Sequence, residues 1–259
     1  MSDSVVVAIP ARFGASRLPG KPLLLAAGKP LIEHVIGRAR LLKGAELVVA
    51  TDDQRIAAVA ERLQVRSILT RAEHPTGSDR LAEVADHLGW ADDRIVVNLQ
   101  GDEPLMPLSC LEAVIAALQD DPGAAAATLA TPVLEVRELF DPACVKVVCD
   151  LRGHALYFSR APIPWARDAL ARDRGQLPPD PILRHVGLYA YRAGTLRRFA
   201  CLAKSPLEQA ESLEQLRLLE NGLSIVVRMA PEPIPAGIDT PEDLERFRTL
   251  LGDGPDGGP

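Results

Sequence analysis

The chain has 259 residues, of which 47% are hydrophobic, and its 29 Lys and Arg against 35 Asp and Glu give a formal net charge of -6. A chain of this length buries roughly three quarters of the surface that it exposes when unfolded, which is enough for a substantial core. The acidic balance argues against a protein that coats DNA or RNA, because that affinity comes from uncompensated Lys and Arg. We therefore expect no nucleic-acid partner.

Cysteine usage and hydropathy indicate the compartment. The four cysteines are irregularly spaced, contain no CxxC pair and have no histidines arranged with them as a ligand set, so we expect free thiols in a reducing compartment. The sequence has no run of about 18 apolar residues, and its N-terminus lacks the basic region of a secretion signal. These features predict a soluble cytoplasmic protein without membrane insertion.

Apolar runs alternate with amphipathic stretches through the first hundred residues. Strands are expected over residues 5–10, 47–50, 65–69 and 94–99, and helices over 31–42, 54–63 and 78–88. Strands that alternate with helices form right-handed crossovers and a mostly parallel sheet. The sequence therefore predicts an α/β fold.

The pattern changes beyond residue 130. Strands are expected over 145–149, 155–159 and 186–191 with few helical residues between them, which indicates an added antiparallel lobe. A helix over 211–220 that stops at Asn221-Gly222, a strand over 224–229 and a last helix capped by Thr240 with Pro241 at its first position complete the prediction. Residues 252–259 contain only Gly, Pro and Asp and are expected to form a disordered tail.

Ligands of open α/β sheets lie beyond the carboxyl ends of the strands, and the loop after the first strand, residues 11–22, is strongly cationic. It carries Arg12, Arg17 and Lys21 and no acid, which favours polyphosphate binding over a solvated turn. Its glycine spacing is one residue too long for a Walker loop, and Pro22 stands where a metal-binding hydroxyl would be. The metal ligands must therefore come from elsewhere.

Two later loops supply carboxylates at the same kind of position. Asp102 follows the strand over 94–99 directly, and two prolines separate it from the next helix, so it is not a helix cap. Asp239 precedes Thr240, which already caps the last helix, so its side chain is not needed for helix initiation. Because magnesium prefers oxygen ligands and retains several waters, these two carboxylates are expected to hold one or two magnesium ions.

Eight segments, spread from the first strand to the last helix, resemble the 3-deoxy-manno-octulosonate cytidylyltransferase (CMP-Kdo synthetase) family. They are IPARFGASRLPGKPL (9–23), HPTGSDRLAEV (74–84), VNLQGDEP (97–104), VKVV (145–148), YFSRAPIPW (157–165), RHVGLYAYR (184–192), SPLEQAESLEQLR (205–217) and GIDTPEDLER (237–246). One departure is Ala166, where the family pattern leads us to expect Asp.

The resemblance implies a Rossmann-like nucleotidyltransferase fold of the nucleotide-diphospho-sugar transferase type. It implies a homodimer in which CTP and Kdo, 3-deoxy-D-manno-octulosonate, give CMP-Kdo and pyrophosphate for lipopolysaccharide synthesis. One cytidylyltransferase domain over residues 1–251 is expected, with a nucleotide-binding part over about 1–130, a sugar-binding and dimerisation part over about 131–235 and a closing helix over 240–251.

The same resemblance assigns roles position by position. It implies a triphosphate clamp at Arg12, Arg17 and Lys21, nucleotide contacts at Arg71, Ser78, Arg80 and Gln100, magnesium at Asp102 and Asp239, and a sugar-acid pocket at Arg160, Arg167, His185, Tyr189, Glu214 and Gln215. The residues that it implies to be catalytic are Arg12, Lys21, Asp102 and Asp239. Bringing an anionic sugar to an anionic triphosphate is mainly an electrostatic task, so no protein nucleophile or dedicated general base is expected.

Alternatives remain at the level of the sequence. Without the resemblance, His185 and Tyr189 could be satisfied polar groups on a strand face, Arg160 a surface charge, and Glu214 and Gln215 part of a solvated helix face. The nearest alternative activity is that of a sialic-acid cytidylyltransferase. A glycosyltransferase would need a DxD-like signature, which residues 100–102 only half supply, and a non-catalytic nucleotide sensor would bind CTP without releasing pyrophosphate.

Overall fold

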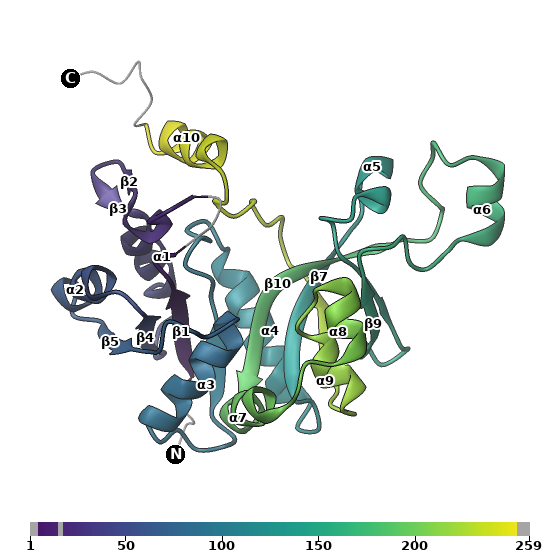
Figure 1. Ribbon diagram of the computed structural model, residues 1–259. Coiled ribbons are helices and arrows are strands. Elements are labelled where there is room, and N and C mark those ends of the chain that lie inside the picture. The colour runs from purple at the N-terminus through teal and green to yellow at the C-terminus, as the bar shows by residue number, and fades with distance from the viewer. Residues whose placement is uncertain (1–4, 15–17, 253–259) are drawn as a thin grey trace. The chain divides into compact units, whose positions relative to one another are not determined.

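The computed structural model describes residues 5–14 and 18–252 (Figure 1). The chain divides into two compact units. The first is formed by the described parts of Met1–Glu112, Arg192–Ala200 and Ile234–Pro259, and the second by Ala113–Tyr191 and Cys201–Pro233.

The first unit is built on four parallel strands. Their order is β6 (Ile95–Asn98), β1 (Val6–Ala11), β4 (Glu46–Thr51) and β5 (Arg66–Leu69). Every residue of β1 is buried, as expected for a parallel strand that has neighbours on both sides. The alternating pattern of the sequence therefore predicted this sheet correctly.

Helices follow these strands, and local side chains define where several of them begin. The helices of this unit are α1 (Leu31–Ala39), α2 (Gln54–Arg62), α3 (Gly77–His87), the first part of α4 (Leu108–Asp120), α7 (Ala193–Cys201) and α10 (Pro241–Leu250). The side chains of Asp53, Thr76 and Thr240 each accept a hydrogen bond from a backbone amide of the first turn, which satisfies amides that have no partner within the helix.

A 3-10 turn, η1 (Lys21–Leu23), leads into the short hairpin of β2 (Leu25–Ala26) and β3 (Lys29–Pro30). None of the helices in the described residues combines the length and the apolar composition needed to span a bilayer.

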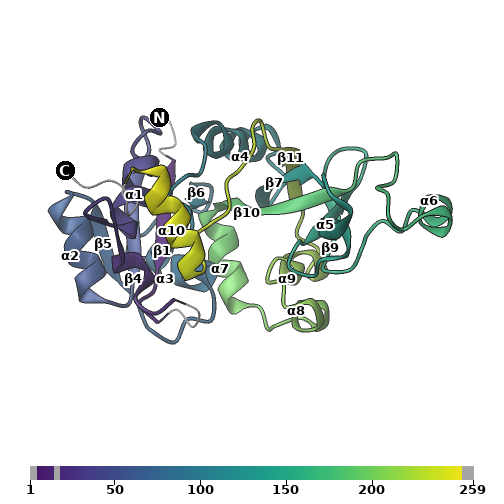
Figure 2. The ribbon, with the colours of Figure 1, turned by 90° about the horizontal axis from the view of Figure 1, so that it is seen from above.

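The last helix packs onto the first one. Leu31 of α1 forms a buried cluster with Leu244 and Phe247 of α10 and with Ile238 just before it, and the ring of Phe247 meets that of His34 edge-on at 5.1 Å. Figure 2 shows α10 in yellow beside α1. This packing fixes the segment that carries Asp239.

The second unit contains the three antiparallel strands that the sequence predicted, β8 (Lys146–Cys149), β9 (Ala155–Ser159) and β10 (Leu183–Arg192), and also β7 (Ala126–Pro132), which was not predicted from the sequence. β10 pairs antiparallel with β7 and with β8, and β8 pairs antiparallel with β9. β11 (Ile225–Met229) adds to β7 in parallel. Two short helices, α5 (Val136–Phe140) and α6 (Arg167–Arg172), interrupt this part of the chain.

The prediction of one helix over 211–220 was wrong. Two helices occupy this region, α8 (Pro206–Glu211) and α9 (Leu216–Glu220). Ser205 and Glu208 form a capping box that starts α8 earlier, with Pro206 at its first position. Ser212 then adopts a left-handed conformation with φ of 52°, which ends the helix because continued α-helical hydrogen bonding requires negative φ.

Candidate functional site

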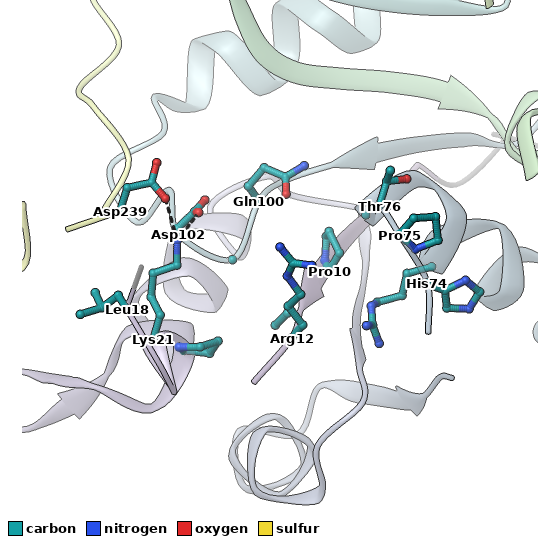
Figure 3. A pocket seen from close by; sticks show the side chains of 15 residues that line it. Pro10, Arg12, Leu18, Lys21, His74, Pro75, Thr76, Gln100, Asp102 and Asp239 are labelled. Carbon is teal, nitrogen blue, oxygen red and sulfur yellow. Dashed lines mark hydrogen bonds and ion pairs between the residues drawn. The ribbon is translucent and has the colours of Figure 1, made fainter. Parts of the chain in front are cut away.

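A pocket opens at the carboxyl ends of β1 and β6 in the first unit (Figure 3). The end of β1 contributes Pro10 to Arg12, the loop after β6 contributes Gln100 to Asp102, and the start of α3 contributes Thr76 and Gly77. Lys21 and Asp239 complete one side. This is the edge of the sheet at which parallel α/β folds bind their ligands.

The three loops singled out in the sequence meet at Lys21. Its Nζ lies 2.6 Å from Asp102 Oδ2 and 3.1 Å from Asp239 Oδ1, as the dashed lines of Figure 3 show. The backbone amide of Ile238 donates to the carbonyl of Asp102 at 2.9 Å, so the second and third loops are also joined directly. The Asp102 side chain is 28% exposed and that of Asp239 48%, and both line the pocket, so the two carboxylates face the pocket rather than the core.

Glu103 adds a third acid that sequence reasoning missed. Burial, followed by the negative charges of Asp102 and Asp239, raises the pKa of Glu103 to about 8, although Lys21 opposes the shift. Its Oε2 is buried and has no hydrogen-bond partner among the described residues. Burial is the largest cause of this shift, and the smaller contribution of Asp102 and Asp239 reflects how closely the three acids are gathered beside Lys21.

The loop after β1 is anchored by Asp52, which follows β4 and was also missed. Asp52 Oδ1 accepts from the backbone amide of Phe13 at 3.1 Å, and Oδ2 accepts from Arg80 Nη2 at 3.2 Å. The Arg55 guanidinium lies 3.8 Å from the centre of the Phe13 ring, a cation–π contact. Gly20 covers another part of this ring, since a Cβ at that position would lie 3.0 Å from it.

The predicted nucleotide residues do not all gather in the pocket. Arg12, Arg80 and Gln100 line it. Ser78 is buried in the first turn of α3, whereas Arg71 is exposed, lies 3.5 Å from Glu83 and does not line the pocket. Arg17 lies outside the described residues. The pocket also contains His74, Pro75, Thr76 and Gly77, for which the HPTGSDR segment was the only signal.

Several predicted sugar-acid residues lie together in the second unit. The rings of His185 and Tyr189 are 5.3 Å apart, and Phe158 meets His185 edge-on at 4.9 Å. β10 bulges between Val186 and Tyr189. The Thr128 hydroxyl lies within hydrogen-bond distance of the carbonyls of both Val186 and Leu188, at 2.9 and 2.8 Å.

The protonation of the two aromatic side chains follows from their surroundings. Desolvation lowers the pKa of His185 to about 3, so the imidazole is neutral. The Thr128 hydroxyl also lies 3.1 Å from His185 Nε2, so the neutral ring has a hydrogen-bonding partner inside the protein. Burial, followed by Tyr191 and Glu214, raises the pKa of Tyr189 well above its ordinary value, which keeps its hydroxyl protonated.

The remaining sugar-acid candidates differ in their surroundings. Glu214 and Gln215 lie in the turn between α8 and α9 rather than on a helix face, and Gln215 Nε2 is buried without a hydrogen-bond partner in the described part of the chain. Arg160 donates to three backbone carbonyls. Arg167 lies apart at the start of α6, where its exposed guanidinium pairs with Asp168.

Comparisons with known proteins give the family. The cytidylyltransferase family matches residues 6–225. A 3-deoxy-manno-octulosonate cytidylyltransferase of Stenotrophomonas maltophilia is 56% identical over 248 residues, which are 95% of this chain and 96% of that protein. Another, from Pseudomonas syringae pv. tomato, is 53% identical over 252 residues, 97% and 99% of the two chains.

The chain belongs to the 3-deoxy-manno-octulosonate cytidylyltransferase family. Solved structures agree with this assignment. A CMP:2-keto-3-deoxy-manno-octonic acid synthetase complexed with CTP superposes with a TM-score of 0.87 and 44% identity, over 96% of this chain and 98% of that one. A 4-diphosphocytidyl-2C-methyl-D-erythritol synthase, at 16% identity and a TM-score of 0.64, shares the fold. The predicted nucleotidyltransferase fold is therefore confirmed.

Proposed function

We propose that this chain transfers CMP from CTP to the anomeric hydroxyl of Kdo, which gives CMP-Kdo and pyrophosphate for lipopolysaccharide synthesis. In this reaction the hydroxyl oxygen attacks the α-phosphorus, the bond to the β-phosphate breaks, and the hydroxyl proton leaves to solvent. The single observation that carries the proposal is the meeting of Lys21, Asp102 and Asp239 in one pocket, in a chain whose relatives carry out this chemistry.

On the nucleotide side, cations supply the electrostatic stabilisation. Lys21 and Arg12 contact the phosphates and stabilise the leaving pyrophosphate, because developing negative charge is best met by donors already held in place. Arg80 and Gln100 line the same pocket and contact the nucleotide. Arg17, Arg71 and Ser78 keep the nucleotide-binding roles that the resemblance implies.

Asp102 and Asp239 are the residues that would hold magnesium. Their carboxylates converge on one cation, the Lys21 ammonium, and carboxylate oxygens are the ligands that a hard divalent ion prefers, so the donor set fits magnesium. No group of three or more His, Cys, Asp or Glu side chains forms a metal site within residues 5–14 and 18–252, which leaves the other coordination positions to phosphates and water. When bound, magnesium would neutralise phosphate charge and lower the pKa of the attacking hydroxyl.

Removing the metal provides a direct test of this assignment. We expect excess EDTA to abolish pyrophosphate release and an excess of magnesium over EDTA to restore it, because without a divalent cation the two carboxylates repel the triphosphate. The measurement is a coupled pyrophosphate assay on the same preparation before and after both additions. Activity that survives exhaustive chelation would contradict the metal assignment.

On the sugar side, the second unit offers both charge and neutral hydrogen-bonding groups. The Arg160 guanidinium has five N–H hydrogens. Three of them, one on each nitrogen, donate to backbone carbonyls, and the other two remain for a carboxylate. The neutral imidazole of His185 hydrogen-bonds to a sugar hydroxyl, and Tyr189 donates its hydroxyl proton. Glu214, Gln215 and Arg167 complete the proposed sugar-acid set.

The loop that carries Lys21 depends on Gly20. Gly20 has φ of 67°, and a Cβ there would lie 3.0 Å from Phe13, whereas Gly28 has φ of 71° and no atom within 4 Å of an added Cβ. Both Gly→Ala changes are expected to cost about 1 kcal/mol of stability for the left-handed backbone. Only Gly20→Ala should also raise the KM for CTP, because it displaces the ring that anchors the loop. Equal CTP kinetics in the two variants would contradict this role of Phe13.

We also propose that the enzyme is a cytoplasmic homodimer. The family resemblance supports the dimer. The four cysteines all lie in the described residues and form no disulfide, which supports a reducing compartment.

The experiment that tests the function is pyrophosphate release with CTP and a panel of acceptors: Kdo, a sialic acid and no acceptor. We expect release with Kdo and none without an acceptor. Release with the sialic acid alone would favour the alternative cytidylyltransferase. Binding of CTP without release under any condition would favour a nucleotide sensor.

A further inference from the structure

The carboxylate of Glu211 connects two segments of the proposed sugar-acid site. Glu211 is the last residue of α8. Its Oε1 accepts from the Ser159 hydroxyl at 2.5 Å and the Tyr157 hydroxyl at 3.3 Å, and its Oε2 accepts from the Arg160 backbone amide at 2.9 Å. The three donors lie in the second half of β9 or directly after it, so one side chain fixes the position of that part of the strand against α8.

Arg160 strengthens the same connection in the opposite direction. Its Nε donates to the Glu211 carbonyl at 2.6 Å, and its Nη2 donates to the Ser212 carbonyl at 3.3 Å. The buried Lys146 ammonium donates to the Arg160 carbonyl at 2.8 Å. The backbone and side chain of Arg160 are thus both held, and the orientation of its two remaining N–H groups depends on where Glu211 and Ser212 lie.

The chain turns immediately after Glu211 towards the other proposed sugar contacts. Ser212 has φ of 52°, Leu213 is buried, and Glu214 and Gln215 follow before α9 begins. Gln215 is 5% exposed and its Nε2 lacks a hydrogen-bond partner within the described chain. A buried amide nitrogen of this kind is costly unless a ligand or water satisfies it, which fits its proposed place in the sugar-acid site.

We propose that Glu211 is a positioning residue for sugar-acid binding: its carboxylate holds Arg160 on β9 and the turn that carries Glu214 and Gln215 in one fixed arrangement. The inference rests on the proposed function and adds to it a residue that makes no contact with the substrate itself. Burial raises the pKa of Glu211, but the hydrogen bonds from Ser159, Arg160 and Tyr157 outweigh this effect and lower it. The carboxylate form that the three donors require is therefore maintained.

Glu211→Ala tests the proposal, with Glu220→Ala as the matched control. Glu220 ends α9, and its carboxylate accepts from the Leu207 amide at 3.1 Å, so it joins α8 to α9 without bonding to β9. We expect Glu211→Ala to raise the KM for Kdo about tenfold or more while the KM for CTP changes less than about twofold, since bonds to a charged group are lost only on the sugar side. Glu220→Ala should leave both values near those of the wild type.

Two further measurements separate positioning from general destabilisation. Hydrogen exchange in the absence of substrates should accelerate at the Arg160 amide and over 212–215 in Glu211→Ala and not in Glu220→Ala. Glu211→Gln keeps one acceptor oxygen and should restore part of the affinity for Kdo. An unchanged KM for Kdo in Glu211→Ala, or equal rises in both KM values, would overturn the inference. Failure of the wild type to use Kdo would instead refute the proposed function.

Discussion

Asp102→Asn will reduce the rate of pyrophosphate release by about 100-fold or more and leave the melting temperature within about 3 °C of the wild type. The amide keeps the shape of the side chain but removes its negative charge. Asp102 Oδ2 lies 2.6 Å from Lys21 Nζ, and we assign this carboxylate to magnesium binding. Stability changes little, because the Lys21 ammonium keeps Asp239 as a partner at 3.1 Å and the loss of one charge relieves the repulsion between Asp102 and Asp239.

Asp86→Asn is the matched control for this change. Asp86 lies in the same unit and pairs with Arg197 at 2.7 Å, but its side chain is 69% exposed and it does not line the pocket. The test measures the steady-state turnover and the melting temperature of both variants. If Asp102→Asn kept activity within tenfold of the wild type, the assigned role of this carboxylate would be wrong.

Lys21→Ala will weaken CTP far more than Kdo, with an expected rise of about 10- to 100-fold in the KM for CTP. The ammonium is held between two carboxylates in the nucleotide pocket, and its removal leaves them without a counter-charge at the position where phosphates must approach. The triphosphate therefore loses a cationic contact and meets stronger repulsion at the same time. Kdo should be little affected, because its proposed contacts all lie in the second unit.

Lys29→Ala serves as the comparison for Lys21→Ala. Lys29 is a solvent-exposed cation whose nearest acid, Glu33, is 4.0 Å away, so its removal should change neither KM. Initial rates measured against the concentration of each substrate, at saturation of the other, give the KM for CTP and the KM for Kdo of both variants. Equal weakening of CTP and Kdo by Lys21→Ala would show that the lysine is not specific to the nucleotide.

Local sequence signals predicted most of the first unit and much of the second. A cap of α2 within residues 51–53 and the cap of α10 at Thr240 follow from local residue chemistry, and the apolar run before α2 forms β4 as expected. β7 was missed because its segment begins in a run of alanines, which favour helix by propensity, and only its partners β10 and β11 make it a strand. The prediction of one helix over 211–220 failed because the residue with the left-handed backbone is Ser212 and not a glycine, which would have indicated a break.

The sequence singled out the candidate site residues whose chemistry lies on a single loop. It missed the residues whose role depends on contacts between distant segments. Position after a strand was sufficient to single out Asp102 and the cationic loop. Asp52, by contrast, acts through Phe13 and Arg80, and Glu211 through residues some 50 positions earlier. No spacing rule connects such residues, because the fold alone brings them together.

The order in which the chain is synthesised determines when the nucleotide pocket is complete. Asp239 lies 218 positions after Lys21, and its segment is fixed by the packing of α10 against α1. A nascent chain on the ribosome therefore carries the cationic loop and Asp102 well before it carries the second carboxylate. The pocket acquires its full charge balance only after α10 has emerged, so we expect incomplete translation products to lack a functional nucleotide site.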